Sequence, residues 1–141
     1  MIQQKYKNIA MEKTVILCVD DEKIILNSIK AQLKANYGNS FLYETAESAN
    51  EALEIIDEIM IDLTVKLIII SDWLMPGIKG DEFLIKVHNK YPNSLKIMLT
   101  GQADTKSIEK TRKEASLYKC IRKPWVQSEL FSCIDSGSAT Y

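Results

Sequence analysis

Aliphatic runs that end in a polar side chain constrain the fold of this chain more than any other feature. The clearest run covers residues 67–70, and Ser71 and Asp72 follow it, ahead of a Met-Pro-Gly turn at residues 75–77. A carboxylate inside a buried strand would carry a large desolvation cost, so Asp72 is expected at the strand's end. Three further runs end in the same way, at Asp20 and Asp21, at Thr100, and at Lys123.

Continuous aliphatic runs are typical of parallel strands that are covered on both faces. The runs predict strands near residues 14–19, 41–46, 66–71, 96–100 and 117–122. Apolar residues recur at helical spacing between them, and the sequence from Ser48 to Glu51 has the form of a helix start. We expect Gly38 to end the first helix and the last helix to cover about residues 125–134. This alternation predicts an α/β fold of (βα)5 type with a doubly wound parallel sheet.

The helix expected at residues 104–115 contains Ile108 as almost its only large apolar side chain. It should therefore be more exposed than its neighbours. At 141 residues the chain is expected to form one domain, over residues 13–135. We expect residues 1–12 to be a flexible N-terminal extension and residues 136–141 a flexible C-terminal tail.

Composition excludes several classes of function. The net charge of −1 and the absence of a basic run argue against direct binding to nucleic acid. No apolar run approaches the length of a membrane span, and the first residues lack the apolar stretch of a signal peptide. Three cysteines without a CxxC pair fit reduced thiols in the cytoplasm. We therefore expect a cytoplasmic protein.

The polar strand ends predict a functional site, because the carboxyl ends of parallel strands meet at one edge of a sheet. Two carboxylates about 4 Å apart repel by roughly 4 kcal/mol at an effective dielectric near 20, so the acidic cluster needs protons or a cation. Carboxylate oxygens at the mouth of a cleft suit Mg²⁺. Together with Lys123 and Thr100, this set favours phosphoryl transfer onto a carboxylate.

Each part of this pattern also has a purely structural interpretation. The Asp20-Asp21 pair could cap the following helix, and Thr100-Gly101 and the Met-Pro-Gly sequence could be simple turns. Lys123-Pro124 is uninformative by itself. These three features and Lys123-Pro124 nevertheless occur in order, each at a strand end. This combination favours a functional site over four unrelated turns.

These residues resemble the receiver domain of two-component response regulators. The resemblance extends over about residues 13–135 and rests on Asp20-Asp21, Asp72 with the Met-Pro-Gly turn and Gly80, Thr100-Gly101, and Lys123-Pro124. The ending Lys123-Pro124-Trp125 is similar to receivers attached to cyclic-di-nucleotide phosphodiesterases or other signalling enzymes. The resemblance implies a flavodoxin-like sheet with strand order 2-1-3-4-5.

The resemblance also implies a role for each residue. Asp72 would accept a phosphoryl group from a sensor histidine kinase or a phosphotransfer protein, and the signal would pass by conformational change to an unknown output domain or protein. Mg²⁺ would be held by Asp20, Asp21, Asp72 and the backbone carbonyl of Leu74. The phosphoryl group would contact Lys123, Thr100 and Gly101. The chain would not be an enzyme in the usual sense, although it would assist its own phosphorylation and dephosphorylation.

One position departs from the family pattern. Receivers usually have an aromatic residue three positions before the lysine, and here Cys120 occupies that position. Thr100 and Cys120 are therefore the expected switch residues. Strand alternation predicts that Tyr118 lies on the same side as Cys120 and fills part of the missing ring's space.

Two other functions remain as alternatives. A phosphohydrolase with an aspartate nucleophile needs a second acid, commonly two residues beyond the nucleophile, where this chain has Leu74. A binding module that works without phosphorylation would not need the complete acidic cluster and Lys123. No output domain is recognisable after residue 135, so we expect either a stand-alone regulator or a fragment of a larger one.

Overall fold

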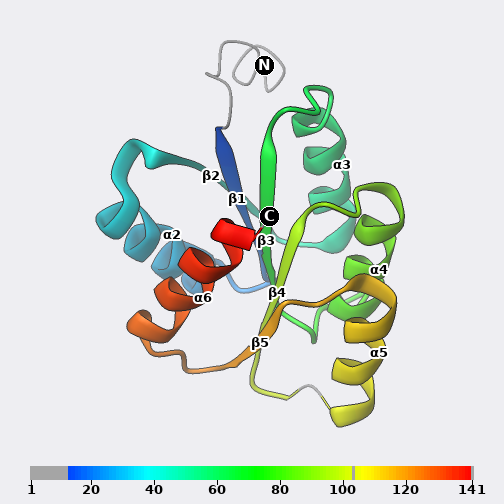
Figure 1. Ribbon diagram of the computed structural model, residues 1–141. Helices are drawn as coiled ribbons and strands as arrows, with labels where there is room; N and C mark the ends of the chain where they lie inside the picture. Colours follow the sequence, from blue (N-terminus) through cyan, green and yellow to red (C-terminus); the bar gives the residue numbers. More distant parts are fainter. Residues whose placement is uncertain (1–12, 103, 141) are drawn as a thin grey trace.

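The computed structural model describes residues 13–102 and 104–140, which form five strands and five α-helices (Figure 1). The strands are β1 (Thr14–Val19), β2 (Phe41–Ala46), β3 (Lys66–Ser71), β4 (Leu95–Thr100) and β5 (Lys119–Arg122). The helices are α2 (Lys23–Tyr37), α3 (Ala49–Ile59), α4 (Gly80–Lys90), α5 (Thr105–Ala115) and α6 (Gln127–Thr140), and a short 3-10 turn covers Gly38–Ser40.

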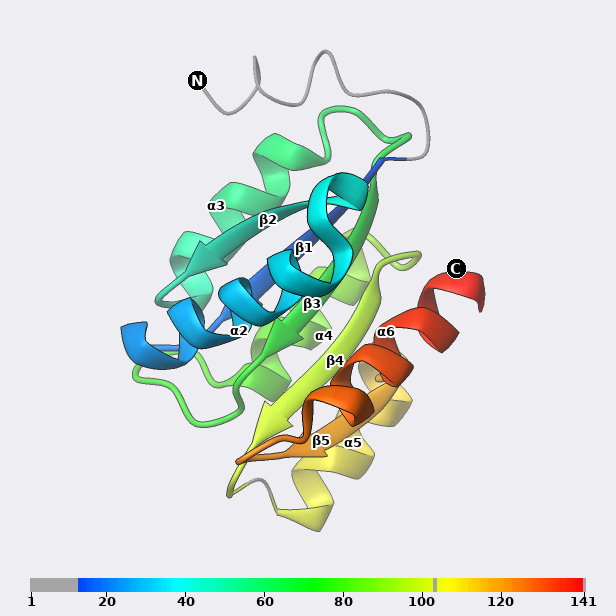
Figure 2. The same cartoon turned by 90° about the vertical axis from the view of Figure 1, so that its left-hand side faces the viewer.

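The strands form one parallel sheet in the order β2-β1-β3-β4-β5, which confirms the expected topology. In this sheet β1 is hydrogen-bonded to β2 on one side and to β3 on the other, with Val19 opposite Ala46 and Ser71. Helices α2 and α6 cover one face, and α3, α4 and α5 cover the other (Figures 1 and 2). Both faces of the central strands are therefore buried, as their continuous aliphatic runs predict.

Alternation along β1 divides the core into two clusters. Val15 and Leu17 pack on the face that α3 and α4 cover, whereas Ile16 and Cys18 pack on the face of α2 and α6. All four side chains are almost completely inaccessible to solvent. Successive strand residues point to opposite faces, so one strand contributes to both halves of the core.

The helix ends follow the sequence signals. The Ser48 hydroxyl accepts a hydrogen bond from the Glu51 backbone N–H at 3.1 Å, which satisfies a donor that the first turn of α3 leaves without a partner. Gly38 ends α2 with φ +54°, a conformation that glycine adopts without steric cost. Helix α5 buries only Thr111 and Ala115, in agreement with its expected exposure.

The C-terminal part differs from the sequence prediction. Helix α6 continues to Thr140, so residues 136–140 belong to the helix and not to a loose tail. Gly137 is buried there, and a Cβ atom at this position would lie 2.6 Å from Cδ2 of Leu95. The absence of a side chain lets the end of α6 pack against the sheet. The predictions for residues 1–12 and for residue 141 lie outside the described residues.

Within the described part of the chain, none of the helices combines the length and the apolar composition that crossing a membrane requires.

Candidate metal and phosphoryl-transfer site

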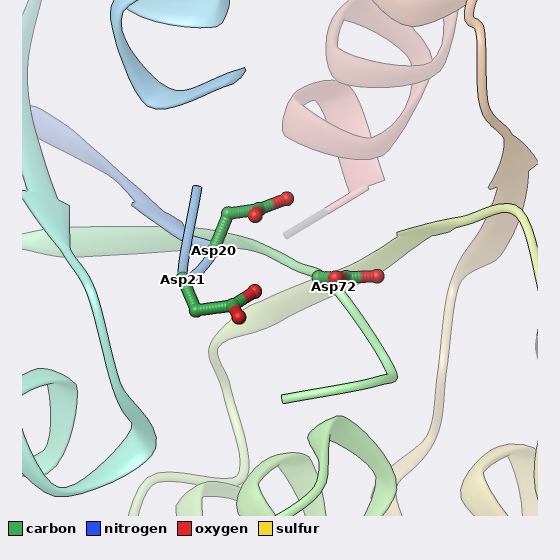
Figure 3. Close-up of side chains that lie close together, drawn as sticks. All are labelled: Asp20, Asp21 and Asp72. Carbon is green, nitrogen blue, oxygen red and sulfur yellow. The ribbon is translucent and has the colours of Figure 1, made fainter. Parts of the chain in front are cut away.

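Four strands deliver polar side chains to their carboxyl ends. Asp20 and Asp21 follow β1, Asp72 follows β3, Thr100 is the last residue of β4, and Lys123 follows β5. Figure 3 shows the side chains of Asp20 and Asp21 beside that of Asp72. The order of the strands brings the ends of β1 and β3 together, because these two strands are neighbours in the sheet.

The three aspartates form a compact acidic cluster. One carboxylate oxygen from each of Asp20, Asp21 and Asp72 lies within 4.8 Å of the other two. Asp20 and Asp72 are 3% and 8% exposed, whereas Asp21 is exposed to solvent. Backbone hydrogen bonds extend the sheet to this point, from the Asp20 N–H to the Ala46 carbonyl at 3.1 Å and from the Asp72 N–H to the Val19 carbonyl at 2.9 Å. The two buried carboxylates are therefore held on rigid elements.

Lys123 is the cation of the cluster. Its Nζ lies 2.6 Å from Oδ2 of Asp20 and 3.4 Å from Oδ2 of Asp72. Burial disfavours the Lys123 ammonium, but the hydrogen bond to Asp20 and the charge of Asp72 outweigh this effect and raise its pKa. Burial also raises the pKa of Asp72, which the positive charge of Lys123 partly offsets. Lys123 thus remains charged and favours the carboxylate form of Asp72.

The remaining hydrogen bonds show which oxygens are engaged. Oδ1 of Asp72 accepts a hydrogen bond from the Trp73 N–H at 2.8 Å, and Oδ1 of Asp20 accepts one from the Glu22 N–H at 2.9 Å. The second bond closes a turn between Asp20 and Glu22 ahead of α2, but it does not cap the helix, because the N-cap of α2 is Glu22 and no side chain caps it. Asp20 therefore holds this turn and pairs with Lys123 at once.

The donor set fits a small divalent cation. Octahedral Mg²⁺ holds oxygen ligands at about 2.0–2.1 Å, so opposite ligands are about 4.2 Å apart. The spacing of the aspartate oxygens, within 4.8 Å, is close to that range. Exposure of Asp21 leaves room for the waters that Mg²⁺ usually keeps. Asp20, Asp21 and Asp72 are accordingly the residues that could hold the ion.

Thr100 and Gly101 lie beside the end of β5. Thr100 is 5% exposed, its carbonyl accepts a hydrogen bond from the Lys123 N–H at 3.1 Å, and its Oγ1 accepts one from the Gln102 N–H at 3.3 Å. A Cβ atom on Gly101 would come no closer than 3.9 Å to the Lys123 side chain. The glycine thus keeps this part of the edge open. A side chain at this position would cause no steric conflict with the residues around it.

Gly80 has a structural role that sequence reasoning missed. A Cβ atom at this position would lie 2.1 Å from the backbone carbonyl oxygen of Asp72 and 2.8 Å from Cα of Trp73. The Gly80 N–H also donates to the Trp73 carbonyl at 2.8 Å. The sequence shows a glycine after a turn, but only the tertiary structure reveals that it packs directly on the backbone of Asp72.

The prediction for Tyr118 is wrong. Its side chain packs in the cluster on the α2 and α6 face and its hydroxyl lies 2.7 Å from the Ser136 hydroxyl of α6, whereas Cys120 packs on the α3 to α5 face. The strand begins only at Lys119, so the alternation of β5 does not extend back to Tyr118. No ring from Tyr118 therefore fills space beside Cys120, which is a half-buried thiol whose pKa is raised by burial.

The chain is similar to known proteins over most of its length. The family described as response regulator receiver domain matches residues 16–135. Among curated proteins, the chain is 34% identical over 126 residues to the regulatory protein VanR of Enterococcus faecium, covering 89% of this chain and 50% of VanR. It is 29% identical over 123 residues to the hydrogenase transcriptional regulatory protein HoxA of Cupriavidus necator, covering 87% of this chain and 24% of HoxA. The chain thus spans a quarter to a half of the length of these relatives.

Solved structures show the same fold. A response regulator receiver domain protein from Clostridium thermocellum superposes with a TM-score of 0.79 at 29% identity, over 90% of this chain and 95% of that one. The signal receiver domain of an HD domain-containing protein from Pseudomonas fluorescens Pf-5 gives a TM-score of 0.80 at 26% identity, over 92% of this chain and all of that one (100%).

Proposed function

The chain belongs to the family of response regulator receiver domains, and we propose from this that it accepts a phosphoryl group on Asp72. The donor is a phosphohistidine on a histidine kinase or phosphotransfer protein. In the transfer, a carboxylate oxygen of Asp72 forms a bond to phosphorus as the bond from phosphorus to the histidine nitrogen breaks, and that nitrogen takes up a proton. The product is an acyl phosphate on Asp72.

The single observation that supports Asp72 most strongly is the position of its carboxylate between a cation and two further carboxylates. Lys123 Nζ lies 3.4 Å from Oδ2 of Asp72, and the oxygens of Asp20 and Asp21 are within 4.8 Å. A metal bound by the three carboxylates would neutralise the incoming phosphate. Because Nζ of Lys123 already lies beside Oδ2, it would lie near a phosphoryl group attached to Asp72. In the Asp72 carboxylate, Trp73 holds Oδ1, so Oδ2 is the oxygen we assign as nucleophile.

Mg²⁺ is the cation we assign to this site, with Asp20, Asp21 and Asp72 as carboxylate ligands. The backbone carbonyl of Leu74, two residues after Asp72, is the fourth protein ligand in this proposal. Thr100 contributes its hydroxyl to the phosphoryl group, and Gly101 leaves room for the donor. The ion supplies charge neutralisation between the acidic cluster and the phosphate.

Exposed apolar side chains support docking of the donor at this edge. Ile24 at the start of α2, Leu74 after β3 and Val126 before α6 are 83%, 45% and 63% exposed. All three belong to segments at the carboxyl ends of the strands, where Asp72 lies. Burial of exposed apolar side chains is a main favourable contribution to protein association. We therefore assign this rim to the phosphodonor. We assign the output partner to the surface of α5 and β5, where Thr100 and Cys120 form the switch.

One experiment tests the acceptor. The protein is incubated with acetyl phosphate and Mg²⁺ and its intact mass is measured. We expect one added phosphoryl group in the parent protein and none in Asp72→Asn, which lacks the acceptor. Chelation of the metal should also prevent phosphorylation, since an uncompensated acidic cluster repels a phosphate dianion.

Asp81→Asn is the matched control, because Asp81 is a second aspartate with 8% exposure, yet it lies in the first turn of α4 and not among the clustered carboxylates. This variant should be phosphorylated like the parent. An undiminished adduct in Asp72→Asn, or full phosphorylation without metal, would contradict the proposal.

A further inference from the structure

Strand β3 ends on a serine whose side chain is completely buried. Ser71 follows the aliphatic residues 67–70, its exposed fraction is 0%, and it is the last residue of β3 that pairs with β1 and β4. An apolar side chain would fit a buried strand without loss of hydration, whereas a buried hydroxyl is unfavourable unless it forms a hydrogen bond. The partner of this hydroxyl therefore indicates what the serine contributes.

The partner is the backbone of Asp72, the proposed phosphoacceptor. Oγ of Ser71 donates a hydrogen bond to the carbonyl oxygen of Asp72 at 2.9 Å. The register of β3 with both neighbouring strands ends at Ser71, so this carbonyl lies beyond the ladder of the sheet. A backbone carbonyl that is removed from water needs a donor, and the serine hydroxyl supplies one at the point where strand pairing stops.

The same peptide group holds the carboxylate of Asp72 at its other end. The carbonyl of Asp72 and the N–H of Trp73 belong to one planar peptide unit and point in opposite directions. This N–H donates a hydrogen bond to Oδ1 of Asp72 at 2.8 Å. A rotation of the peptide unit that releases its carbonyl from Ser71 also turns its N–H away from Oδ1. The two hydrogen bonds are therefore coupled through one rigid group.

The residues on both sides of this peptide unit are fixed as well. The Asp72 N–H donates to the Val19 carbonyl at 2.9 Å, and the Trp73 carbonyl accepts a hydrogen bond from the Gly80 N–H at 2.8 Å. Nζ of Lys79 lies 5.2 Å from the centre of the Trp73 ring, a position in which an ammonium is attracted to an aromatic face. The peptide unit between Asp72 and Trp73 is thus anchored before and after.

We propose that Ser71 is a positioning residue for phosphoryl transfer to Asp72. Its hydroxyl fixes the peptide unit that follows Asp72, which keeps the Trp73 N–H on Oδ1 and presents Oδ2, 3.4 Å from Nζ of Lys123, as the attacking oxygen. The inference rests on the proposed function, because it concerns the rate of that transfer. Small displacements of a nucleophile from the reacting geometry lower the rate, so a group that acts only through Asp72 affects the reaction.

The rate of phosphorylation by acetyl phosphate tests this role. Intact mass gives the rate over a range of acetyl phosphate concentrations, at a Mg²⁺ concentration that saturates each variant. Ser71→Ala should lower the maximal rate about fivefold, the effect of one lost hydrogen bond, and leave the acetyl phosphate concentration at half-maximal rate unchanged. Weaker binding of the donor would change that concentration instead.

Two further substitutions separate the hydrogen bond from packing. Ser71→Cys keeps a side chain of similar size but replaces the hydroxyl by a weak donor, so it should be nearly as slow as Ser71→Ala. Ser71→Thr keeps the hydroxyl and should stay within about twofold of the parent rate. A packing role predicts the opposite order, because threonine adds a methyl group to a filled site. Circular dichroism checks that each variant is folded.

Ser94→Ala is the matched control. Ser94 is 4% exposed, and its Oγ donates to the Tyr91 carbonyl at 2.7 Å, directly before β4 and therefore at the opposite edge of the sheet. This variant also loses a buried hydroxyl-to-carbonyl bond, yet it should be phosphorylated at the parent rate.

Three results would each overturn the inference: the parent rate in Ser71→Ala, the parent rate in Ser71→Cys, or an equal loss of rate in Ser94→Ala. In all three the parent protein is phosphorylated, so the proposed function stands. A parent protein that gains no phosphoryl group would overturn the proposed function, and this inference with it.

Discussion

Substitution of Gly80 by alanine tests whether the start of α4 fixes the backbone of the proposed acceptor. The new Cβ atom would lie 2.1 Å from the Asp72 carbonyl oxygen, about 1 Å inside normal van der Waals contact. Both contacting groups are backbone atoms, so no side chain can rotate away. Overpacking of this kind costs about 1–3 kcal/mol, and alanine returns less than about 1 kcal/mol through its higher helix propensity. We expect a net loss of about 2 kcal/mol in the free energy of unfolding.

Urea denaturation followed by circular dichroism measures this loss. With a slope of about 2 kcal/mol per molar, the midpoint should fall by about 1 M. The rate of phosphorylation by acetyl phosphate should fall as well, because the Asp72 backbone has to move. Gly101→Ala is the control, since its Cβ would come no closer than 3.9 Å to another atom, and it should change the stability by less than about 0.5 kcal/mol. An equally small change for Gly80→Ala would refute the reasoning.

Three further predictions concern single side chains. Ser48→Ala removes the hydroxyl that accepts a hydrogen bond from the Glu51 N–H, and it should lower the free energy of unfolding by about 1 kcal/mol. Urea denaturation measures this loss, and an unchanged midpoint would contradict the capping role of Ser48. Lys96 is completely buried, its Nζ donates hydrogen bonds to the carbonyls of Ser94 and Pro92, and burial lowers its pKa from 10.5 to about 8. Between these values the unfolded chain binds a proton that the folded chain has lost, so the parent gains stability as the pH rises through this window. Lys96→Met should therefore raise the free energy of unfolding by about 1–2 kcal/mol at pH 7. Denaturation curves at pH 7 and pH 10 should show that the difference between variant and parent is smaller at pH 10. An equal difference at the two pH values would disprove the argument. Leu74→Asn places a hydrogen-bonding group beside Asp72, where it can orient a water for attack on phosphorus, so it should shorten the lifetime of the phosphorylated state. The decay of the phosphorylated mass with time measures this lifetime, and a longer lifetime would contradict the argument.

The sequence by itself determined the strands, their order of appearance and the residues at their ends. An aliphatic run and the polar residue that ends it are local features, and burial follows from them directly. The acidic cluster at the carboxyl edge of the sheet could therefore be predicted, as could the caps at Ser48 and Gly38. The family resemblance added the strand order.

Other features depend on contacts between residues far apart in the chain. The sequence indicated that Lys123 lies near the acidic cluster, but only the tertiary structure pairs it more closely with Asp20 than with Asp72. The need for glycine at position 80 arises from a backbone that approaches from β3, and Tyr118 lies on the unexpected face because β5 begins one residue after it.

The same holds for the end of α6 and for the neighbourhood of α3 and α5. Residues 136–140 look like a polar tail, yet the buried Gly137 lets the helix continue against Leu95 of the sheet. The acid-rich residues 41–65 and the Lys- and Arg-rich residues 105–122 are far apart in the sequence, and only the crossover connections of the sheet place α3 and α5 on the same side of the molecule. Local patterns decide what each segment forms, whereas the packing of the segments decides which side chains meet, because that depends on distances that no single stretch of sequence contains.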